Sequence, residues 1–306
     1  MIIDKLVDKM IEKQAPIIVG LDPTLALIPE YLKKQVFNEK GKNPIALANI
    51  FFMFNKAIID AVHDLVPAVK LQIAMYEQLG AIGIGCYTKT CDYAKEKGLI
   101  VVGDIKRGDI SSTATAYSNA HLGSIDIEGE SVSTFNQDMV TVNPYMGFDS
   151  VEPFLADCKK YNKGIFVLIK TSNPSSGQIQ DLVTEGKPLF EHVARLVSGW
   201  GRDHIGKYGY SSVGAVVGCT YVAEAKRLLD IMPNTFFLLP GYGAQGASGK
   251  DLKTLFDTDS YGAIVNSSRG IMGAFKDEKY KAKFGEKDFA QASRQAVLDM
   301  KADLAI

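Results

Sequence analysis

Short apolar runs rich in valine and isoleucine recur along the chain, and each is followed by a longer stretch of mixed polarity. A strand buried in a parallel sheet is apolar on both faces, whereas a helix that covers the sheet needs only one apolar face. The alternation therefore predicts repeated strand–helix units. The predicted strands span 16–21, 68–73, 99–105, 139–143, 164–170, 213–219, 235–239 and 263–266.

These units follow one another without a linker or a break in composition. Eight consecutive strand–helix units favour one closed (β/α)8 TIM barrel over two open sheets. We therefore expect an α/β protein with a single barrel domain over residues 1–306 and with helical and loop insertions.

The clearest predicted helix spans 44–65, where Ile50, Phe54 and Ile58 recur at helical spacing and predict a buried face. Further helices are predicted at 187–205 and 288–304. The connections 25–43, 121–138 and 172–187 are longer than a barrel needs. Long connections on a rigid scaffold often form binding loops.

Composition narrows the class of protein. Of the 306 residues, 46% are hydrophobic and 23% are charged, and the formal net charge is −1. A chain of this kind can bury a large core, and its near-neutral charge argues against a general nucleic-acid or anionic-membrane surface. The N-terminus has no basic region before a long apolar core, and we expect no apolar run to reach membrane-spanning length.

The four cysteines are scattered and form no Cys-x-x-Cys pair. No histidine stands at a spacing that would complete a metal site with them. We therefore expect no metal site, unpaired thiols and a reducing, cytoplasmic location. The cysteines are Cys86, Cys91, Cys158 and Cys219.

The stretch 103–110 concentrates charge at the end of the third predicted strand. Asp104 and Lys106 are two residues apart, so on an extended backbone both side chains would point to the same side. Gly108 would let the chain turn before Asp109. An ordinary strand end with solvated charges is the alternative, and an isolated D-x-K-x-x-D string would favour it. The other strand ends decide between the two.

Active sites of such barrels are built at the C-terminal ends of the strands. Segments 240–246 and 266–270 follow the last two predicted strands with a glycine-rich turn and a Ser-Ser-Arg-Gly turn. Their exposed N–H groups and the guanidinium of Arg269 suit a phosphate. Singly, each would more often be a plain turn or a surface arginine. Together, after adjacent strands, they favour phosphate binding.

Two earlier strand ends carry single charges. Lys70 interrupts the apolar second strand, and Asp22 follows the first. Lys70 could extend outward into solvent, and Asp22 before a proline could simply start a turn. The position of Lys70 near the Asp104 cluster in the predicted barrel favours a shared site.

Seven ordered segments, over nearly the whole chain, resemble the orotidine 5'-phosphate decarboxylase family in its longer bacterial-type branch of about 300 residues. The D-x-K-x-x-D string alone is shared with related sugar-phosphate decarboxylases and synthases. The chain departs from the family pattern at Leu71 and Met75, where we expect effects on packing only. The segments are Gly-Leu-Asp-Pro at 20–23, 68–72 with the following Tyr-Glu at 76–77, Asp-Ile-Lys-Arg-Gly-Asp-Ile at 104–110, 142–147, Thr-Ser-Asn-Pro at 171–174, 240–246 and 266–270.

The resemblance implies a role for each matching residue. The catalytic residues Lys70, Asp104, Lys106 and Asp109 would form an alternating lysine–aspartate network, with Asp109 reaching into the neighbouring subunit of a homodimer. Among the substrate-binding residues, Asp22 with Lys70 would bind the ribose hydroxyls, and Thr113 of the partner chain would contact the ribose. Ser172 and Gln245 would bind the polar edge of the pyrimidine, with Gln245 also near the phosphate. Arg269 and the backbone of Ser268 would bind the phosphate.

The implied reaction is decarboxylation of orotidine 5'-monophosphate to uridine 5'-monophosphate and CO₂ in pyrimidine biosynthesis. It leaves negative charge on a ring carbon that has no evident electron sink. Lys106 would stabilise this carbanion and deliver a proton to it. Asp104 would face the substrate carboxylate, either straining the ground state or positioning Lys106. No motif calls for a cofactor or a metal, so we expect neither.

Three alternatives share parts of this pattern. A metal-dependent sugar-phosphate decarboxylase or synthase would place an acidic residue on the second strand, and the ammonium of Lys70 would repel its metal ion. A non-catalytic phosphoribosyl-ligand binder is expected to lack Lys106 or Asp104, and both are present. Fusion to a phosphoribosyltransferase is not expected, because the barrel occupies the chain.

Overall fold

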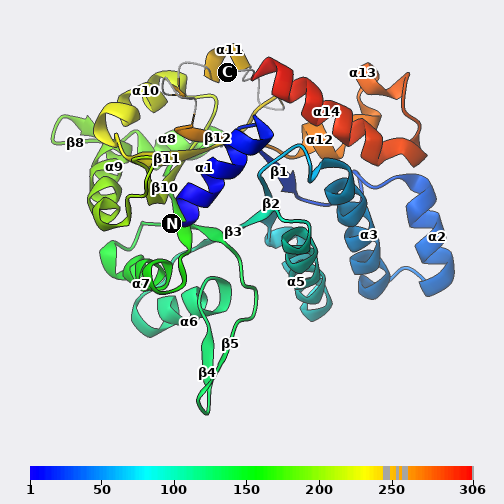
Figure 1. The fold of residues 1–306 in the computed structure, drawn as a ribbon, viewed down its shortest axis with the longest axis horizontal. Coiled ribbons are helices and arrows are strands. Elements are labelled where there is room, and N and C mark those ends of the chain that lie inside the picture. Colours follow the sequence, from blue (N-terminus) through cyan, green and yellow to red (C-terminus); the bar gives the residue numbers. More distant parts are fainter. Residues whose placement is uncertain (244–248, 253–254, 257–260, 305–306) are drawn as a thin grey trace.

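The computed structural model describes residues 1–243, 249–252, 255–256 and 261–304, and eight parallel strands in it close into a barrel (Figure 1). Around the barrel the order is β1-β12-β11-β10-β7-β6-β3-β2, and β2 pairs with β1 to close it. The predicted TIM barrel is therefore confirmed. The strands are β1 (Ile17–Leu21), β2 (Ala68–Gln72), β3 (Ile100–Arg107), β6 (Met139–Val142), β7 (Gly164–Lys170), β10 (Ser211–Val217), β11 (Thr235–Pro240) and β12 (Ala263–Ser267).

The predicted strands all appear, and their ends move by at most a few residues. The sixth is displaced as a whole, because β10 begins at Ser211 and ends at Val217 where 213–219 was predicted. Nearly every barrel-strand residue is buried. This explains why the strands read as continuous apolar runs rather than as alternating ones.

Helices cover the outside of the barrel. In α3 the side chain of Asn43 accepts a hydrogen bond from the N–H of Ala46 and Pro44 occupies the first turn, both common features of a helix start. The predicted helices 44–65, 187–205 and 288–304 are confirmed as α3, α9 and α14, with a 3₁₀ turn after α9. The main outer helices are α3 (Pro44–Val62), α5 (Ala81–Glu96), α6 (Ser111–His121), α7 (Glu152–Tyr161), α9 (Leu189–Trp200), α10 (Val222–Ile231) and α14 (Phe289–Asp303).

One helix corrects an expectation about membranes. By length and composition, α3 could span a membrane, with a mean hydropathy of 1.6 over its most apolar window, so the expectation that no run is long enough was wrong. More than half of that window is buried inside the protein. Ile50, Phe54 and Ile58 are fully buried in the core, as the helical spacing predicted.

The three long connections carry structure of their own. The first contains α2 (Glu30–Lys40), and the second forms a hairpin of β4 (Ile125–Ile127) and β5 (Glu130–Val132) that projects away from the barrel (Figure 1). The third contains a 3₁₀ turn (Pro174–Ser176), α8 (Gly177–Gln180) and β8 (Val183–Thr184), which pairs with β9 (Lys187–Pro188).

The N-terminal end of the barrel is closed by α1 (Ile2–Lys13). Its apolar face, including Ile3, Leu6 and Met10, packs against side chains that point into the barrel, such as Ile18 and Ala68. The other face of each strand packs against the outer helices in a separate, larger cluster. With this end closed by apolar side chains, the polar site lies at the opposite, C-terminal ends of the strands.

Candidate active site

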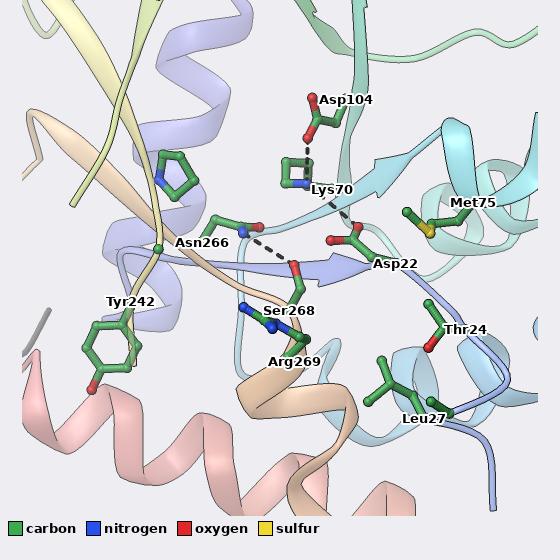
Figure 2. Close-up of a pocket in the computed structure, with 13 residues that line it drawn as sticks. Asp22, Thr24, Leu27, Lys70, Met75, Asp104, Tyr242, Asn266, Ser268 and Arg269 are labelled. Atoms are coloured by element: carbon green, nitrogen blue, oxygen red, sulfur yellow. Dashed lines mark hydrogen bonds and ion pairs between the residues drawn. The ribbon is translucent and has the colours of Figure 1, made fainter. Parts of the chain in front are cut away.

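Two pockets adjoin at the C-terminal ends of the barrel strands. They share Lys70, Asp104 and Pro240, so they meet at the Lys70–Asp104 ion pair. The larger, shown in Figure 2, has a volume of about 460 Å³ and is lined by Asp22, Thr24, Ala26, Leu27, Lys70, Met75, Asp104, Pro240, Gly241, Tyr242, Asn266, Ser268 and Arg269. The smaller, of about 240 Å³, is lined by Lys70, Asp104, Lys106, Thr141, Leu168, Thr171, Ser172, Asn173, Val216, Leu238 and Pro240.

The buried carboxylate of Asp104 is the centre of the site. Its Oδ2 accepts hydrogen bonds from Lys70 Nζ at 2.9 Å and from Gln72 Nε2 at 3.0 Å. Its Oδ1 accepts from Lys106 Nζ at 2.5 Å and from Thr141 Oγ1 at 2.9 Å. Four donors on three strands thus hold one carboxylate in a single orientation.

Charge at this centre is fixed by neighbours rather than by solvent. Burial alone would raise the pKa of Asp104, but the ammonium groups of Lys70 and Lys106 outweigh burial and hold that pKa well below its usual range. Burial alone would lower the pKa of Lys70, yet the carboxylates of Asp104 and Asp22 raise it above its usual range. Asp104 is therefore a carboxylate and Lys70 an ammonium at neutral pH.

An irregularity in β3 brings Lys106 to this carboxylate. Gly103 pairs with Val140 and Arg107 with Val142. Between these two pairs β3 therefore contains more residues than β6. Within this bulge Lys106 has a φ of 47°, in the left-handed region that side chains rarely adopt. The predicted meeting of Asp104 and Lys106 is confirmed, although a bulge rather than a regular extended backbone produces it.

The turn after β3 corrects a further expectation. Gly108 was expected to let the chain turn, but the left-handed residues here are Lys106 and Ser111. A Cβ on Gly108 would lie 3.1 Å from the carbonyl oxygen of Asn143. The glycine therefore eases the close approach of these two segments of the chain.

Acceptors without donors face the larger pocket. Asp22 Oδ1 lies 3.7 Å from Lys70 Nζ, and neither Asp22 Oδ1 nor Asn266 Oδ1 accepts a hydrogen bond from the described residues, although both atoms are buried. Figure 2 shows Asp22 and Asn266 on either side of the pocket. Because buried acceptors without donors are costly, the pair suits a ligand that brings hydroxyl groups.

The far end of the larger pocket carries Ser268 and Arg269, directly after β12. Arg269 is exposed, and its guanidinium lies beside Ser268 in Figure 2. Ser268 can approach β1 only because residue 20 is glycine, since a Cβ there would lie 1.8 Å from Ser268 Oγ. An exposed guanidinium with serine beside it is an arrangement that can bind an anion.

The smaller pocket holds Lys106 on β3 and Ser172 after β7, and these two strands are separated in the barrel by β6 alone. Ser172 follows β7, and a Cβ on Gly218 would lie 2.9 Å from the Cβ of Ser172, so the two chain segments pack closely. The Lys106 side chain keeps 45% of its surface exposed, in contrast to the 5% of Lys70. An ammonium that is reachable from the pocket and paired with a fixed carboxylate can transfer a proton to a bound molecule.

Two of the predicted site residues, Asp109 and Thr113, line neither pocket. Asp109 is half-buried and its Oδ1 accepts the N–H of Ile110, while Thr113 is exposed on the first turn of α6. Within the described chain, the Lys106 ammonium pairs with Asp104 and not with Asp109. Gln245 lies outside the described residues.

The structure adds residues to which the sequence assigned no role. Gln72 is two positions from Lys70 on β2, so its place on the same face could have been inferred. Thr141 is a polar residue in a buried strand, and its partner Asp104 is set by strand pairing. Met75 lines the larger pocket beside Asp22, whereas Leu71 is fully buried in the core. That both residues affect packing only stays a prediction.

Metal ligands do not gather in the part of the chain that the structure describes. No group of three or more His, Cys, Asp or Glu side chains there could hold a metal ion. The carboxylates at the pocket junction, Asp22 and Asp104, both face the ammonium of Lys70.

Comparisons with known proteins agree with one another. Residues 16–283 match the model of the Orotidine 5'-phosphate decarboxylase / HUMPS family. The chain is 46% identical over 306 residues to orotidine 5'-phosphate decarboxylase of Petrotoga mobilis, covering 99% of this chain and 98% of the relative. It is 45% identical over 274 residues to the protein of that name in Caldicellulosiruptor saccharolyticus, covering 90% of each. The solved structure of Leishmania donovani OMP decarboxylase is similar, with a TM-score of 0.70, 26% identity and 98% coverage of both chains.

Proposed function

The chain belongs to the orotidine 5'-phosphate decarboxylase family, and we propose that Lys106 completes its reaction by protonating the product. The enzyme is a lyase of pyrimidine biosynthesis that converts orotidine 5'-monophosphate to uridine 5'-monophosphate and CO₂. The observation that carries the proposal is the Lys70–Asp104–Lys106 array at the junction of the two pockets. This array stands where the two halves of a nucleotide would join.

The substrate fits the two pockets by its chemistry. Its phosphate belongs with Arg269 and Ser268, and its ribose hydroxyls belong with the free acceptor of Asp22, beside Lys70. The pyrimidine then enters the smaller pocket, where Ser172 can bond to its polar edge. Gln245 remains part of the proposal for both the base and the phosphate.

In the reaction the bond between ring carbon C6 and the carboxylate carbon breaks, and its electron pair stays on C6 as CO₂ leaves. The ammonium of Lys106 stabilises this charge and then gives its proton to C6, which leaves a neutral amine and uridine 5'-monophosphate. The hydrogen bond to Asp104 holds Lys106 in place before the proton moves. No electron sink beyond this ammonium is required.

Asp104 itself lies close to where the substrate carboxylate must enter. Its two oxygens already accept four hydrogen bonds, so it cannot turn away from an incoming anion. This supports positioning of Lys106 as its first role, with repulsion of the substrate carboxylate as a second. Contacts to the phosphate are remote from the breaking bond, and their binding energy can offset that repulsion.

The active unit is proposed to be a homodimer in which Asp109 and Thr113 serve the site of the other subunit. In support, the segment that carries both residues presents exposed side chains, with Ile110 49% exposed. These side chains are therefore accessible to a second subunit.

Mixed dimers test this sharing of the site. Subunits with Lys106→Ala and subunits with Asp109→Asn should each have little activity by themselves, but a mixed dimer has one site with both natural residues. An equal mixture should regain about a quarter of the wild-type activity if subunits assort at random. No recovery in a mixture whose subunits demonstrably exchange would contradict the shared site.

Catalysis without a cofactor or metal remains a prediction, which would be contradicted if a chelator abolished turnover and Mg²⁺ restored it.

A cytoplasmic location is proposed as well. It is supported by the four cysteines, which are free thiols and buried in the protein.

Turnover of orotidine 5'-monophosphate by the Lys106→Ala variant tests the central assignment. We expect kcat to fall by roughly 10²- to 10⁴-fold, the usual contribution of a positioned acid, with wild-type binding of ribose 5-phosphate. Lys226→Ala, which removes an exposed lysine on the outer helix α10, is the matched control and should keep full activity. Full turnover by Lys106→Ala would contradict the proposal.

A further inference from the structure

A second buried lysine stands at the C-terminal end of the barrel, and the mechanism above does not use it. Lys170 is the last residue of β7 and is only 1% exposed, yet it lines neither pocket. Removing an ammonium from water is costly unless it is paired, so its partners show what it does.

The partners of Lys170 come from the long connection after β7. Its Nζ lies 2.5 Å from Oδ1 of Asp181, which directly follows α8. The ammonium also lies 4.5 Å from the centroid of the Tyr221 ring and 5.5 Å from that of Phe190. Two aromatic faces and one carboxylate therefore replace water around this charge.

The residue after Lys170 makes a parallel connection. The N–H of Thr171 donates to Gln180 Oε1 at 3.0 Å, and Gln180 Nε2 donates back to Thr171 Oγ1 at 2.8 Å. Lys170 thus pairs with Asp181, and the neighbouring Thr171 pairs with Gln180. We call the chain between these two ends the 171–181 loop.

The loop carries one wall of the smaller pocket. Thr171, Ser172 and Asn173 line that pocket at the beginning of the loop. At its other end, a Cβ on Gly177 would lie 2.7 Å from Asp181 Oδ2, so the loop is packed tightly around the carboxylate that binds Lys170. A change at Asp181 is therefore transmitted to Ser172 through a short and closed segment.

We infer that Lys170 is a positioning residue: through Asp181 it fixes the 171–181 loop so that Ser172 faces the pyrimidine in the smaller pocket. The inference rests on the proposed placement of the base. It extends that placement by naming the ion pair that makes base recognition depend on a residue outside the pocket. Ribose and phosphate binding, on the opposite side of the Lys70–Asp104 pair, should not depend on it.

The test compares two ligands that differ by the base. In Asp181→Asn, we expect affinity for uridine 5'-monophosphate to fall by roughly tenfold, while affinity for ribose 5-phosphate stays at the wild-type value. Asp181 is half exposed, so the variant should fold, as checked by circular dichroism. Asp181→Glu keeps a carboxylate on the loop and should recover most of the lost affinity.

Two further variants separate positioning from general support of the fold. Glu185→Gln removes an exposed carboxylate from the same connection and should leave both affinities unchanged. In a Ser172→Ala background, Asp181→Asn should weaken uridine 5'-monophosphate binding no further, because the residue that it positions is already gone.

Two outcomes would overturn the inference: equal weakening of both ligands by Asp181→Asn, or unchanged binding of both. Wild-type turnover of orotidine 5'-monophosphate is measured in parallel. Its absence would overturn the proposed function and this inference with it. Normal wild-type turnover together with either of the two outcomes above would overturn the positioning role alone.

Discussion

The two ends of the barrel are made by the same strands but serve different purposes. On β2, Ala68 points into the apolar interior next to α1, and Lys70, two residues later on the same face, is part of the ion network. On β3, Val102 and Asp104 repeat this change. Alternate residues of a strand share a face. Two neighbouring positions on that face can therefore belong to the apolar core and to the ion network, respectively. Substitutions at the C-terminal end should therefore change activity, and substitutions at the N-terminal end should change stability.

At the C-terminal end, Arg269→Ala is expected to change substrate binding strongly and stability hardly at all. Loss of a charge-assisted contact should raise KM for orotidine 5'-monophosphate by roughly 10- to 150-fold with little change in stability. For the nucleoside orotidine, which lacks the phosphate, kcat/KM should stay at the wild-type value. Steady-state kinetics with both substrates give the comparison.

Arg202→Ala is the control for this variant, since Arg202 is exposed on the 3₁₀ turn (Arg202–His204) away from the pockets. It should behave as wild type with both substrates. If Arg269→Ala impaired orotidine and its monophosphate equally, Arg269 would not be the phosphate contact.

At the N-terminal end the expected effect is on stability alone. Leu6 on α1 is 1% exposed, and Leu6→Ala should lower the free energy of unfolding by about 2–5 kcal/mol, while kcat of the folded enzyme stays unchanged. Denaturant unfolding and kinetics on the same preparation measure both quantities. Leu196→Ala, at an exposed leucine of α9, should cost about 0.5 kcal/mol or less. A loss of kcat in Leu6→Ala would show that the two ends are coupled.

Mild acid should produce a more gradual effect, again at the N-terminal end. His121, at the end of α6, is stacked on Phe135, and burial lowers its pKa from 6.5 to about 4. Between these values the unfolded chain binds a proton that the folded chain excludes. The free energy of unfolding should therefore fall as pH falls from 6.5 towards 4, by at most about 1.4 kcal/mol per pH unit from this group.

The variant His121→Gln tests the source of this slope, which should flatten when the imidazole is absent. An unchanged slope would assign the pH dependence to other groups.

The contribution of Asp104 to the free energy of unfolding also falls as pH falls, but at lower pH. Since its pKa is lowered, the stability it supplies is present above its ordinary pKa of about 3.9 and is lost only as pH falls further.

Much of this arrangement could be predicted from the sequence, because it depends on local pattern. Buried strands read as apolar runs, and the charges of Lys70, Asp104 and Lys106 stand at their ends. The bulge at Lys106 could not be predicted, since it arises from the register between β3 and β6. The unpaired acceptor of Asn266 and the contact of Thr141 with Asp104 also depend on neighbours that are distant in sequence.

Two further points lay beyond the sequence for different reasons. Lys170 is the last residue of an apolar strand, and only the return of the chain at Asp181 shows why an ammonium is buried there. The roles of Asp109 and Thr113 depend on a second subunit, and a single chain leaves both outside the pockets. Their assignment still rests on the family resemblance and on the mixed-dimer experiment.

The most direct test of the central claim replaces Lys106 with cysteine and then restores an ammonium chemically. Lys106 is reachable, whereas the four natural cysteines are buried, so alkylation should be selective for residue 106. We expect Lys106→Cys to lose kcat by roughly 10²- to 10⁴-fold and 2-bromoethylamine to restore a large part of it, while 2-bromoethanol, which adds a neutral group, restores none. Equal recovery with both reagents, or full activity before alkylation, would contradict proton delivery by Lys106.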